Sequence, residues 1–315
     1  MTAPTNTFLT TAAIGNREDL ADIIYRISPT QTPVLNLASK TKATLTTHEW
    51  QTQDLAAASG SNEQAEGDDA SAKSITPTVR LQNRTQISTK TVIVSGTQMS
   101  GTNPAGRKDE LGYQVSMAAL ELKRDMETSI TQNDVAVGGT TRRSRGLRGW
   151  IADNINKASG TTLPSYTNNG GLGTAGTWVG TQRAFVESQV KDVLQQIFTA
   201  GGMPDTIMLP PAAKQTFSGF TGNATRMDKS EDSKLYAAVD FYVSDFGTIE
   251  AVPNRFMATR DVFILQSDKL AVAYMRPFQT KELAATGDAE KRELIVEWTL
   301  ECRAPKAHGA IYDIL

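Results

Sequence analysis

The chain has 315 residues, of which 32 are Lys or Arg and 34 are Asp or Glu, and its formal net charge is −2. This length suffices for two subdomains, and the near-neutral charge gives no overall electrostatic reason to bind nucleic acid or an anionic membrane. A single cysteine excludes an intrachain disulfide, and no apolar run reaches the roughly 18 residues of a membrane span. We therefore expect a soluble protein that is not exported and folds in a reducing compartment.

The first predicted element is a short amphipathic helix that ends before Pro29. Asn16 suits its N-cap, and apolar residues follow at helical spacing. These apolar residues are Leu20, Ile23, Ile24 and Ile27. The stripe that they form needs a cover, which is either the rest of the same domain or another subunit.

From Thr41 to Gly96 the sequence predicts a long two-stranded arm. Two β-like runs, KATLTTHEWQ and RTQISTKTVIVSG, flank a polar middle, AAASGSNEQAEGDDASAKS, whose largest apolar side chain is alanine. An isolated ribbon of two strands is marginal in water, so the arm needs a partner surface. Trp50 is the expected anchor, either at the base of the hairpin in its own chain or against a neighbouring chain.

Motifs for metal binding and catalysis are incomplete. The pair His48 and Glu49 begins like a zinc-protease helix, but Thr52 replaces the second histidine of that motif. The stretch GTNPAGRK has the glycine spacing of a phosphate loop, but Arg107 and Lys108 replace its Lys-Ser/Thr pair. We therefore predict no enzymatic activity, no cofactor and no metal site.

The strongest predicted helix runs from about residue 107 to residue 133. One apolar stripe advances along it by three or four residues at a time, and charged residues occupy the opposite face. The stripe comprises Leu111, Val115, Ala118, Leu122, Met126 and Ile130. The charged face comprises Glu121, Lys123, Arg124 and Glu127. We expect this helix to form a strut across a domain, with its stripe in the core.

Four arginines follow within seven residues, in a glycine-containing loop. They are Arg142, Arg143, Arg145 and Arg148. Such guanidinium groups can bind phosphate or pair with carboxylates in planar two-point contacts, and the loop can equally be solvated. Apart from Trp150, the aromatic residues of a single-strand binding platform are missing, so no nucleic-acid readout is inferred. The run 159–180 is predicted as a surface loop or linker.

The second half of the chain predicts a layer of helices and strands. A helix within residues 181–202 buries an apolar face, and strands are predicted at TIMLP, FYVSDFGTIEAVPN and DVFILQSDKLAVAYM, with a short helix at PAAKQTFSGF. The helix face comprises Val186, Val190, Val193, Leu194 and Ile197.

The last predicted strand, RELIVEWTLECRA, alternates apolar and charged residues and pairs with MRPFQTKELAA across the turn TGDAE. Glu297 and Glu301 fall on its charged face, and Cys302 on its apolar face is predicted to be a core residue.

The segments GNREDLADIIYRISPTQTPVLN, THEWQTQDL, GGMPDTIMLPP and LIVEWTLECRAPKAHGAIYDI are similar, in sequence and order, to the SU10-like group of major capsid proteins. The order of the parts resembles the HK97-type fold of tailed-bacteriophage capsid proteins. The resemblance implies an α+β fold with an N-terminal arm at 1–40 and an extended two-stranded loop (E-loop) at 41–96. It also implies a peripheral domain with a spine helix at 97–180, an axial domain at 181–275, and a closing hairpin of the peripheral domain at 276–315.

The function that the resemblance implies is self-assembly into the icosahedral head of a tailed phage, with copies of the chain in pentamers and hexamers. Expected partners are scaffolding and portal proteins, with decoration proteins as further candidates. Double-stranded DNA is expected to be enclosed without sequence readout. Assembly is expected in the host bacterial cytoplasm, and the product is the virion capsid.

In this family the extended loop is expected to lie across a neighbouring subunit. Its acidic tip comprises Glu63, Glu66, Asp68 and Asp69. We predict that this tip meets the arginine loop of the neighbour. Two alternatives stay open at this point. One is an encapsulin-like compartment that holds cargo instead of a genome, and the other is a monomeric binding or enzymatic protein with a catalytic pocket.

Overall fold

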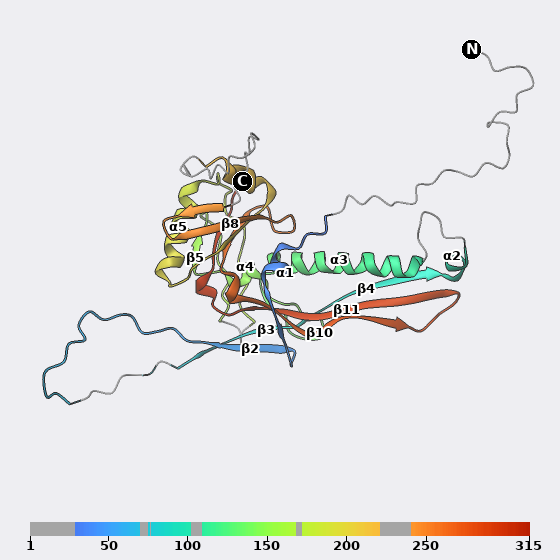
Figure 1. Cartoon of the computed structure of the whole chain (residues 1–315), viewed down its shortest axis with the longest axis horizontal. Helices are drawn as coiled ribbons and strands as arrows, with labels where there is room; N and C mark the ends of the chain where they lie inside the picture. Colours follow the sequence, from blue (N-terminus) through green and yellow to red (C-terminus); the bar gives the residue numbers. More distant parts are fainter. Residues whose placement is uncertain (1–28, 70–74, 76, 102–108, 168–171, 221–240) are drawn as a thin grey trace, which may run out of the picture.

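The computed structural model describes residues 29–69, 75, 77–101, 109–167, 172–220 and 241–315. The predicted N-terminal helix with Ile23, Ile24 and Ile27 lies outside the described residues. Figure 1 shows a rounded unit, from which a long slab of one helix and several strands leads to one side and a thin ribbon to the other. No helix in the described part is both long and apolar enough to cross a membrane.

The predicted spine helix is α3, Glu110–Gln132, which lies along the slab (Figure 1). The buried members of its apolar stripe are Leu111, Ala118, Leu122, Met126 and Ile130. Glu127 was predicted on the charged face and is buried instead. That prediction was wrong because helical spacing cannot reveal that α1, Pro33–Leu37, packs on this side of α3 and donates hydrogen bonds to the carboxylate.

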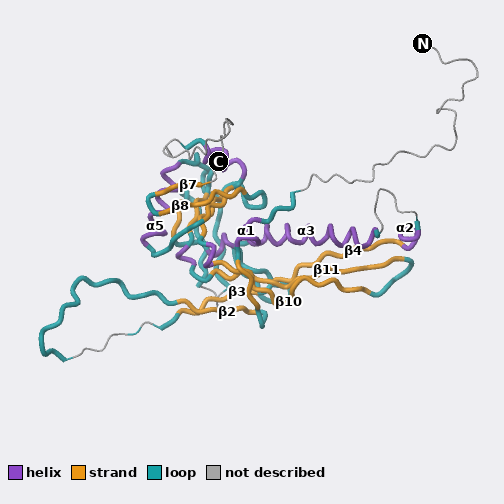
Figure 2. Tube along the Cα trace, viewed as in Figure 1, coloured by secondary structure: helices purple, strands orange, loops and turns teal. Residues whose placement is uncertain are grey.

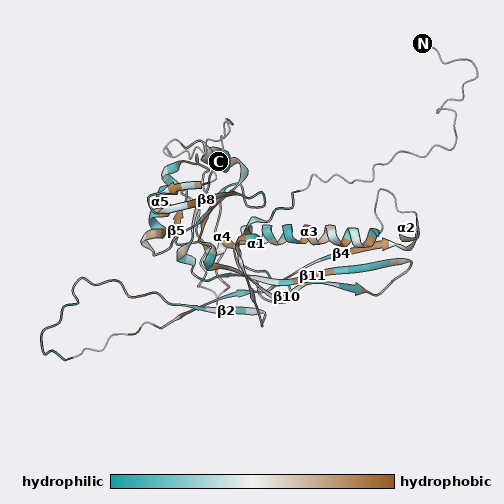
Figure 3. Ribbon diagram, in the orientation of Figure 1, coloured by the Kyte–Doolittle hydropathy of each residue, from teal (hydrophilic) through white to brown (hydrophobic). Residues whose placement is uncertain are grey.

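The strands of the slab form a four-stranded sheet in the order β1-β10-β11-β4, against which α3 packs. Their bounds are β1 Ser39–Lys42, β4 Gln86–Ser95, β10 Leu270–Leu283 and β11 Ala289–Cys302. The predicted pairing of β10 with β11 is confirmed, with Leu283 opposite Lys291 near the outer end. Figure 3 colours much of this outer hairpin as hydrophilic, in keeping with its exposed residues.

The charged face of β11 differs from its prediction in one respect. Glu297 and Glu301 lie on that face, yet both are buried. Each carboxylate is covered by an arginine of the same chain, Arg142 for Glu297 and Arg303 for Glu301. Alternation of residue types could not predict this burial, because the cover comes from residues outside the pattern.

The ribbon consists of β2, Thr47–Thr52, paired antiparallel with β3, Val79–Arg84. The run RTQISTKTVIVSG was predicted as its second strand, and this pairing was wrong: most of that run forms β4 and pairs with β11. β3 carries little β-like signal, because its two buried residues are Leu81 and the polar Asn83. Figure 2 shows that the two strands end well before the tip and that loop continues beyond them.

The rounded unit contains a six-stranded sheet in the order β5-β12-β9-β6-β8-β7. The strands are β5 Asn154–Asn156, β6 Thr206–Leu209, β7 Phe241–Ser244, β8 Gly247–Pro253, β9 Asp261–Leu265 and β12 Gly309–Tyr312. This sheet does not follow the domain boundaries expected at residues 180 and 275. β5 comes from before the first boundary and β12 from after the second, and they pair with each other in parallel.

Two cores lie on the two faces of this sheet. One face is covered by the predicted helices, now α5, Glu187–Thr199, and α6, Pro211–Ser218. Val186 was predicted on the buried face of α5, but it is exposed because it precedes the first turn as the N-cap. On the other face, Trp150, Trp298 and Tyr312 belong to a core that joins the rounded unit to the slab. Shorter helices are α2 Gly96–Ser100, α4 Leu147–Trp150, η3 Ser267–Lys269 and η4 Pro305–Ala307.

Candidate assembly site

The root of the ribbon is anchored by Trp50 in its own chain. The indole Nε1 donates a hydrogen bond to the carbonyl oxygen of Cys302 at 3.0 Å. Its ring centroid lies 5.2 Å from that of Trp150 and 5.7 Å from that of His48. Trp50 was expected to be an anchor either at the base of the hairpin in its own chain or against a neighbouring chain. In the structure it lies at the base of the hairpin. A polar nitrogen with a partner and an aromatic face in the core is the arrangement that tryptophan prefers when it is partly buried.

His48 belongs to a polar cluster beside Trp50. Its Nε2 lies 2.9 Å from Oε2 of Glu301, and Arg303 donates from Nε to Oε1 of the same carboxylate at 2.9 Å. Burial acts to raise the pKa of Glu301, but the hydrogen bonds from His48 and Arg303 outweigh it and lower that pKa to about 2. Among the described residues, no group of three or more His, Cys, Asp or Glu side chains could hold a metal ion.

Asn83 ties the second strand of the ribbon to the body, and sequence reasoning missed it. Its Nδ2 donates to the carbonyl oxygen of Leu300 at 2.7 Å and to that of Arg145 at 3.1 Å. Its Oδ1 accepts the backbone N–H of Arg145 at 2.9 Å. The one signal in the sequence is its spacing of two residues from Leu81, which places both on the buried side of the strand.

Beyond this root the ribbon is exposed. All four acidic residues of the tip, Glu63, Glu66, Asp68 and Asp69, are exposed. So are two large apolar side chains of the same loop, Leu55 at 97% and Ile75 at 85%. Figure 1 shows this segment reaching away from the rest of the molecule. The predicted tip therefore exists as an acidic surface with isolated apolar residues beside it.

The arginine loop is mostly engaged within its own chain. Arg142 pairs with Glu297 at 2.7 Å, and Arg148 pairs with Asp261 at 3.0 Å. Arg145 is 1% exposed and its guanidinium lies 4.5 Å from the ring centroid of Trp150. Pairing with carboxylates was one of the roles expected of these residues, and it is confirmed for Arg142 and Arg148. Only Arg143 is exposed, so the four residues do not form one free basic patch.

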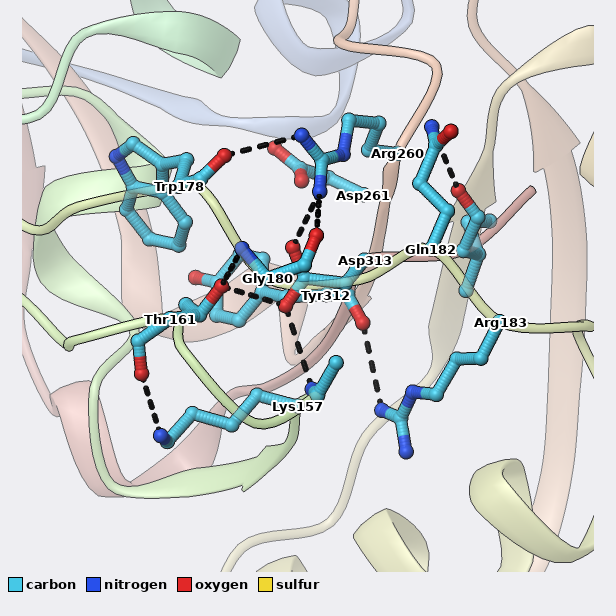
Figure 4. Close-up of polar contacts among 12 residues, drawn as sticks. Lys157, Thr161, Trp178, Gly180, Gln182, Arg183, Arg260, Asp261, Tyr312 and Asp313 are labelled. Carbon is cyan, nitrogen blue, oxygen red and sulfur yellow. Dashed lines mark hydrogen bonds and ion pairs between the residues drawn. The ribbon is translucent and has the colours of Figure 1, made fainter.

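A buried polar cluster ties the 157–183 segment to the C-terminal end of the chain (Figure 4). Asp313 accepts from Oγ1 of Thr161 at 2.7 Å and from Nη2 of Arg260 at 2.8 Å. Arg260 also donates to the carbonyl oxygen of Gly180 at 2.6 Å. A Cβ at Gly180 would meet Thr161 and Asp313 at 2.6 Å or less, so only glycine fits. The run 159–180 was expected to be a surface loop or linker, but these contacts make its two ends part of the body.

An open groove of about 520 Å³ lies at the ribbon root, between the two ribbon strands and the segment Arg303–Lys306. Lys306 and Asp54, one from each wall, pair at 2.6 Å. The lining contains no histidine, cysteine or serine. The lining therefore does not contain the Ser-His or Cys-His pair of the common acyl-transfer sites.

Comparison with known families decides among the open alternatives. The family model of the SU10 major capsid protein matches residues 3–315. The chain belongs to the SU10 major capsid protein family. The resemblance drawn from the sequence is thus confirmed over nearly the whole chain. This SU10-family chain is a structural component of the virion capsid of a tailed phage.

Individual relatives agree with this assignment. The major capsid protein of Escherichia phage Phieco32 is 28% identical over 338 aligned positions, which cover 95% of this chain and 94% of the relative. The capsid asymmetric unit of cyanophage A-1(L) matches with a TM-score of 0.67 at 14% identity, over 97% of this chain and 98% of that one. The latter likeness concerns the fold, and it confirms an HK97-like mixture of helix and sheet.

Two further structures share the fold of the SU10-family chain. One, from phage G, contains major capsid proteins and decoration proteins, with a TM-score of 0.53 at 10% identity over 96% of this chain and 99% of that one. The other is the holo-SrpI encapsulin complex from Synechococcus elongatus, with a TM-score of 0.56 at 10% identity, over 95% and 92% of the two chains.

The structure of the SU10-family chain joins two of its candidate contact regions. Trp50 of the ribbon and Arg145 of the arginine loop both contact the ring of Trp150. The root of the ribbon and the base of the arginine loop are therefore one packed cluster. The acidic tip lies outside this cluster. Within one copy, the tip therefore does not meet the ribbon root or the arginine loop.

Proposed function

We propose that each copy of this chain lays its ribbon across a neighbouring copy, in an icosahedral lattice of pentamers and hexamers. The observation that carries the proposal is the contrast along the ribbon, which is held at its root by Trp50 and Asn83 but exposes 97% of Leu55 beyond it. A polar ribbon that cannot order itself gains buried area from a partner. Many modest contacts of this kind add up to a stable shell.

In this arrangement the slab with α3 and the β10–β11 hairpin forms the peripheral part, and the rounded unit lies around the five-fold and six-fold axes. Large exposed rings on the rounded unit support that placement. Phe198 on α5 is 53% exposed and Phe241 on β7 is 62% exposed. Apolar side chains of this size on a protein surface are favourable places for contact with another copy. The N-terminal arm, with Ile23, Ile24 and Ile27, clamps a neighbour.

The acidic tip of the ribbon meets a cation of the neighbouring copy. Glu66 and Asp68 lie at a turn, and four exposed acids within seven residues attract positive charge. In the arginine loop, Arg142, Arg145 and Arg148 have partners in their own chain, so Arg143 is the residue proposed for this contact.

Scaffolding and portal proteins are the further partners that a closed phage head needs, and assembly takes place in the host cytoplasm. Decoration proteins are supported by the phage G structure, whose major capsid proteins are accompanied by them. Double-stranded DNA is enclosed and not read, in keeping with a net charge of −2.

The SrpI encapsulin shares only the fold with this chain, at 10% identity, whereas the family model of the SU10 major capsid protein matches residues 3–315. The two kinds of shell differ in what they contain. A phage head encloses double-stranded DNA, and an encapsulin encloses cargo protein. The test uses shells purified from the native source. They are treated with nuclease to remove outside nucleic acid and are then opened. Release of double-stranded DNA indicates a phage head, and release of protein without DNA indicates an encapsulin-like compartment.

The proposal is tested by electron microscopy and light scattering of the full chain, expressed alone and with its genomic neighbours. A matched variant replaces residues 56–76 with a two-residue Asn-Gly turn, which keeps the root and Asp54 intact. We expect uniform shells, or rings of five and six that close when a scaffold is added, and we expect the variant to stay as small oligomers with unchanged thermal stability. A wild-type chain that is monomeric in every condition would overturn the proposal, and so would a variant that assembles as well as the wild type.

A further inference from the structure

The carboxylate of Glu127 is buried where three segments of the chain meet. Glu127 lies in α3 and is 0% exposed. Its Oε1 accepts the backbone N–H of Val34 at 2.8 Å and the Nδ2–H of Asn254 at 2.7 Å, and its Oε2 accepts the N–H of Leu35 at 3.0 Å. One side chain of the spine helix therefore joins α1 on one side and the loop after β8 on the other.

These contacts involve groups that need a partner. Val34 and Leu35 lie in the first turn of α1, where the backbone N–H groups have no carbonyl acceptor within the helix. A buried carboxylate is costly, and burial raises the pKa of Glu127 although the three hydrogen bonds oppose it. A site that needed only packing would be better served by an apolar side chain. The carboxylate instead supplies oriented bonds to three donors.

The three segments have different places in the fold. α1 is the first described element after residue 29 and is the root of the N-terminal arm. Asn254 follows β8 and belongs to the rounded unit, and nearby Thr131 of α3 donates from Oγ1 to the carbonyl oxygen of Phe256 at 3.1 Å. Glu127, on the spine helix, is thus in contact with both the arm root and the rounded unit.

We propose that Glu127 is a positioning residue for shell assembly, which holds the root of the N-terminal arm in one orientation against the spine helix. Hydrogen bonds to a charged acceptor are short and directional, whereas apolar packing tolerates sliding. The inference rests on the proposed function in one respect, namely that the arm contacts a neighbouring copy. The holding of α1 within a single chain does not depend on it.

The test uses the full chain with the substitutions Glu127→Met and Glu127→Gln. Methionine keeps a similar volume and removes every acceptor, whereas glutamine keeps one oxygen and turns an NH₂ group toward one of the former donors. Hydrogen exchange of the Val34 and Leu35 amides is measured on unassembled chain. We expect the Val34 and Leu35 amides to exchange at least about tenfold faster in the methionine variant than in the wild type. The increase in exchange rate should be smaller in the glutamine variant. The core amide of Ile207 in β6 should stay unchanged.

The control is Glu121→Gln, an exposed glutamate of the same helix that should alter neither amide. Assembly kinetics are then followed by light scattering, and we expect both Glu127 variants to assemble more slowly than the control. The proposal is overturned if the Val34 and Leu35 amides exchange as in the wild type, or if Ile207 accelerates equally, which would mean a general role in stability. It is also overturned if the two amides accelerate but assembly keeps its wild-type rate. A wild-type chain that forms no shell would refute the proposed function, and the exchange result would still decide whether Glu127 holds α1.

Discussion

The indole nitrogen of Trp50 donates a hydrogen bond to the carbonyl oxygen of Cys302, although 252 positions separate the two residues in the chain. The bond joins the root of the ribbon to the end of the last long strand of the slab. Because β11 is paired with β10 as far as Cys302, the ribbon leaves the body from a rigid base. A rigid base lets a ribbon of otherwise exposed residues present its tip in one direction.

The first prediction concerns this anchor. Trp50→Phe removes the hydrogen bond and should lower the free energy of unfolding by about 1 kcal/mol. Trp50→Ala also removes the ring contact with Trp150 and should cost about 3 kcal/mol. Urea denaturation of the unassembled chain measures both. Leu55→Ala, an exposed position on the same ribbon, should leave the midpoint unchanged, and equal effects of all three substitutions would contradict the anchoring role.

The second prediction concerns stability in acid. The pKa of Glu301 falls from 4.5 to about 2, because the hydrogen bonds from His48 and Arg303 outweigh its burial. A depressed carboxyl pKa contributes stability that is present above pH 4.5 and is lost as the pH falls toward 2. The loss should be on the order of 3 kcal/mol, at 1.36 kcal/mol for each pH unit. In the Glu301→Gln variant, the free energy of unfolding should decrease less between pH 4.5 and pH 2 than in the wild type. The Glu290→Gln variant, changed at an exposed position of the same strand, should show the wild-type decrease.

The third prediction has the opposite sign. Burial raises the pKa of Asp261 to about 6, although its partner Arg148 acts to lower it. The folded state therefore holds this proton more tightly than the unfolded state does. This group favours folding most below pH 3.8, and its contribution is lost as the pH rises through about 6. Carbon-13 NMR of the labelled carboxyl group should show titration near pH 6, and a midpoint near 4 would contradict the effect of burial.

The fourth prediction concerns the single cysteine. Cys302 is 0% exposed, and burial raises the pKa of its thiol well above its usual value. Thiolate is the reactive form, so the native chain should resist alkylation by iodoacetamide. Labelling should become fast in urea, at the concentration where the chain unfolds. Rapid labelling of folded chain in buffer would show that the end of β11 opens readily.

The fifth prediction concerns the acidic tip. Reversing two charges with Glu66→Lys and Asp68→Lys should slow assembly, and it should change the unfolding free energy of the single chain by no more than about 0.5 kcal/mol, because both sites are exposed. Light scattering at several salt concentrations measures the assembly rate. Added salt should reduce the difference in rate between the wild type and the charge-reversed variant. Adding Arg143→Glu to the same chain should restore part of the rate. Wild-type assembly of the doubly reversed chain would count heavily against the proposed contact.

Several elements could be predicted because their signals are local. The apolar stripe of α3, the buried face of α5 and the alternation along β11 each repeat with the period of one secondary structure. The β10–β11 hairpin was predictable because a turn lies directly between two strands with matching patterns. The exposed tip was predictable from composition alone, since polar residues with no apolar side chain larger than alanine cannot form a core.

Other features depend on residues that are distant in the chain. Glu127 and Glu297 look like surface residues in the sequence, yet one meets α1 and the other meets Arg142. The second strand of the ribbon was misassigned because Asn83 is buried by its hydrogen bonds to the main chain of Leu300 and Arg145, and an asparagine carries no apolar signal.

The sequence by itself determined the family, the helices and strands with regular periods, and the acidic tip. Only the tertiary structure decided which strands share a sheet, which charged residues are buried, and which arginines remain exposed. The physical reason is that a period reports the environment along one element, whereas burial of a charge depends on a partner supplied by another. Glu127 is the clearest case, because its three hydrogen-bond donors come from residues 34, 35 and 254.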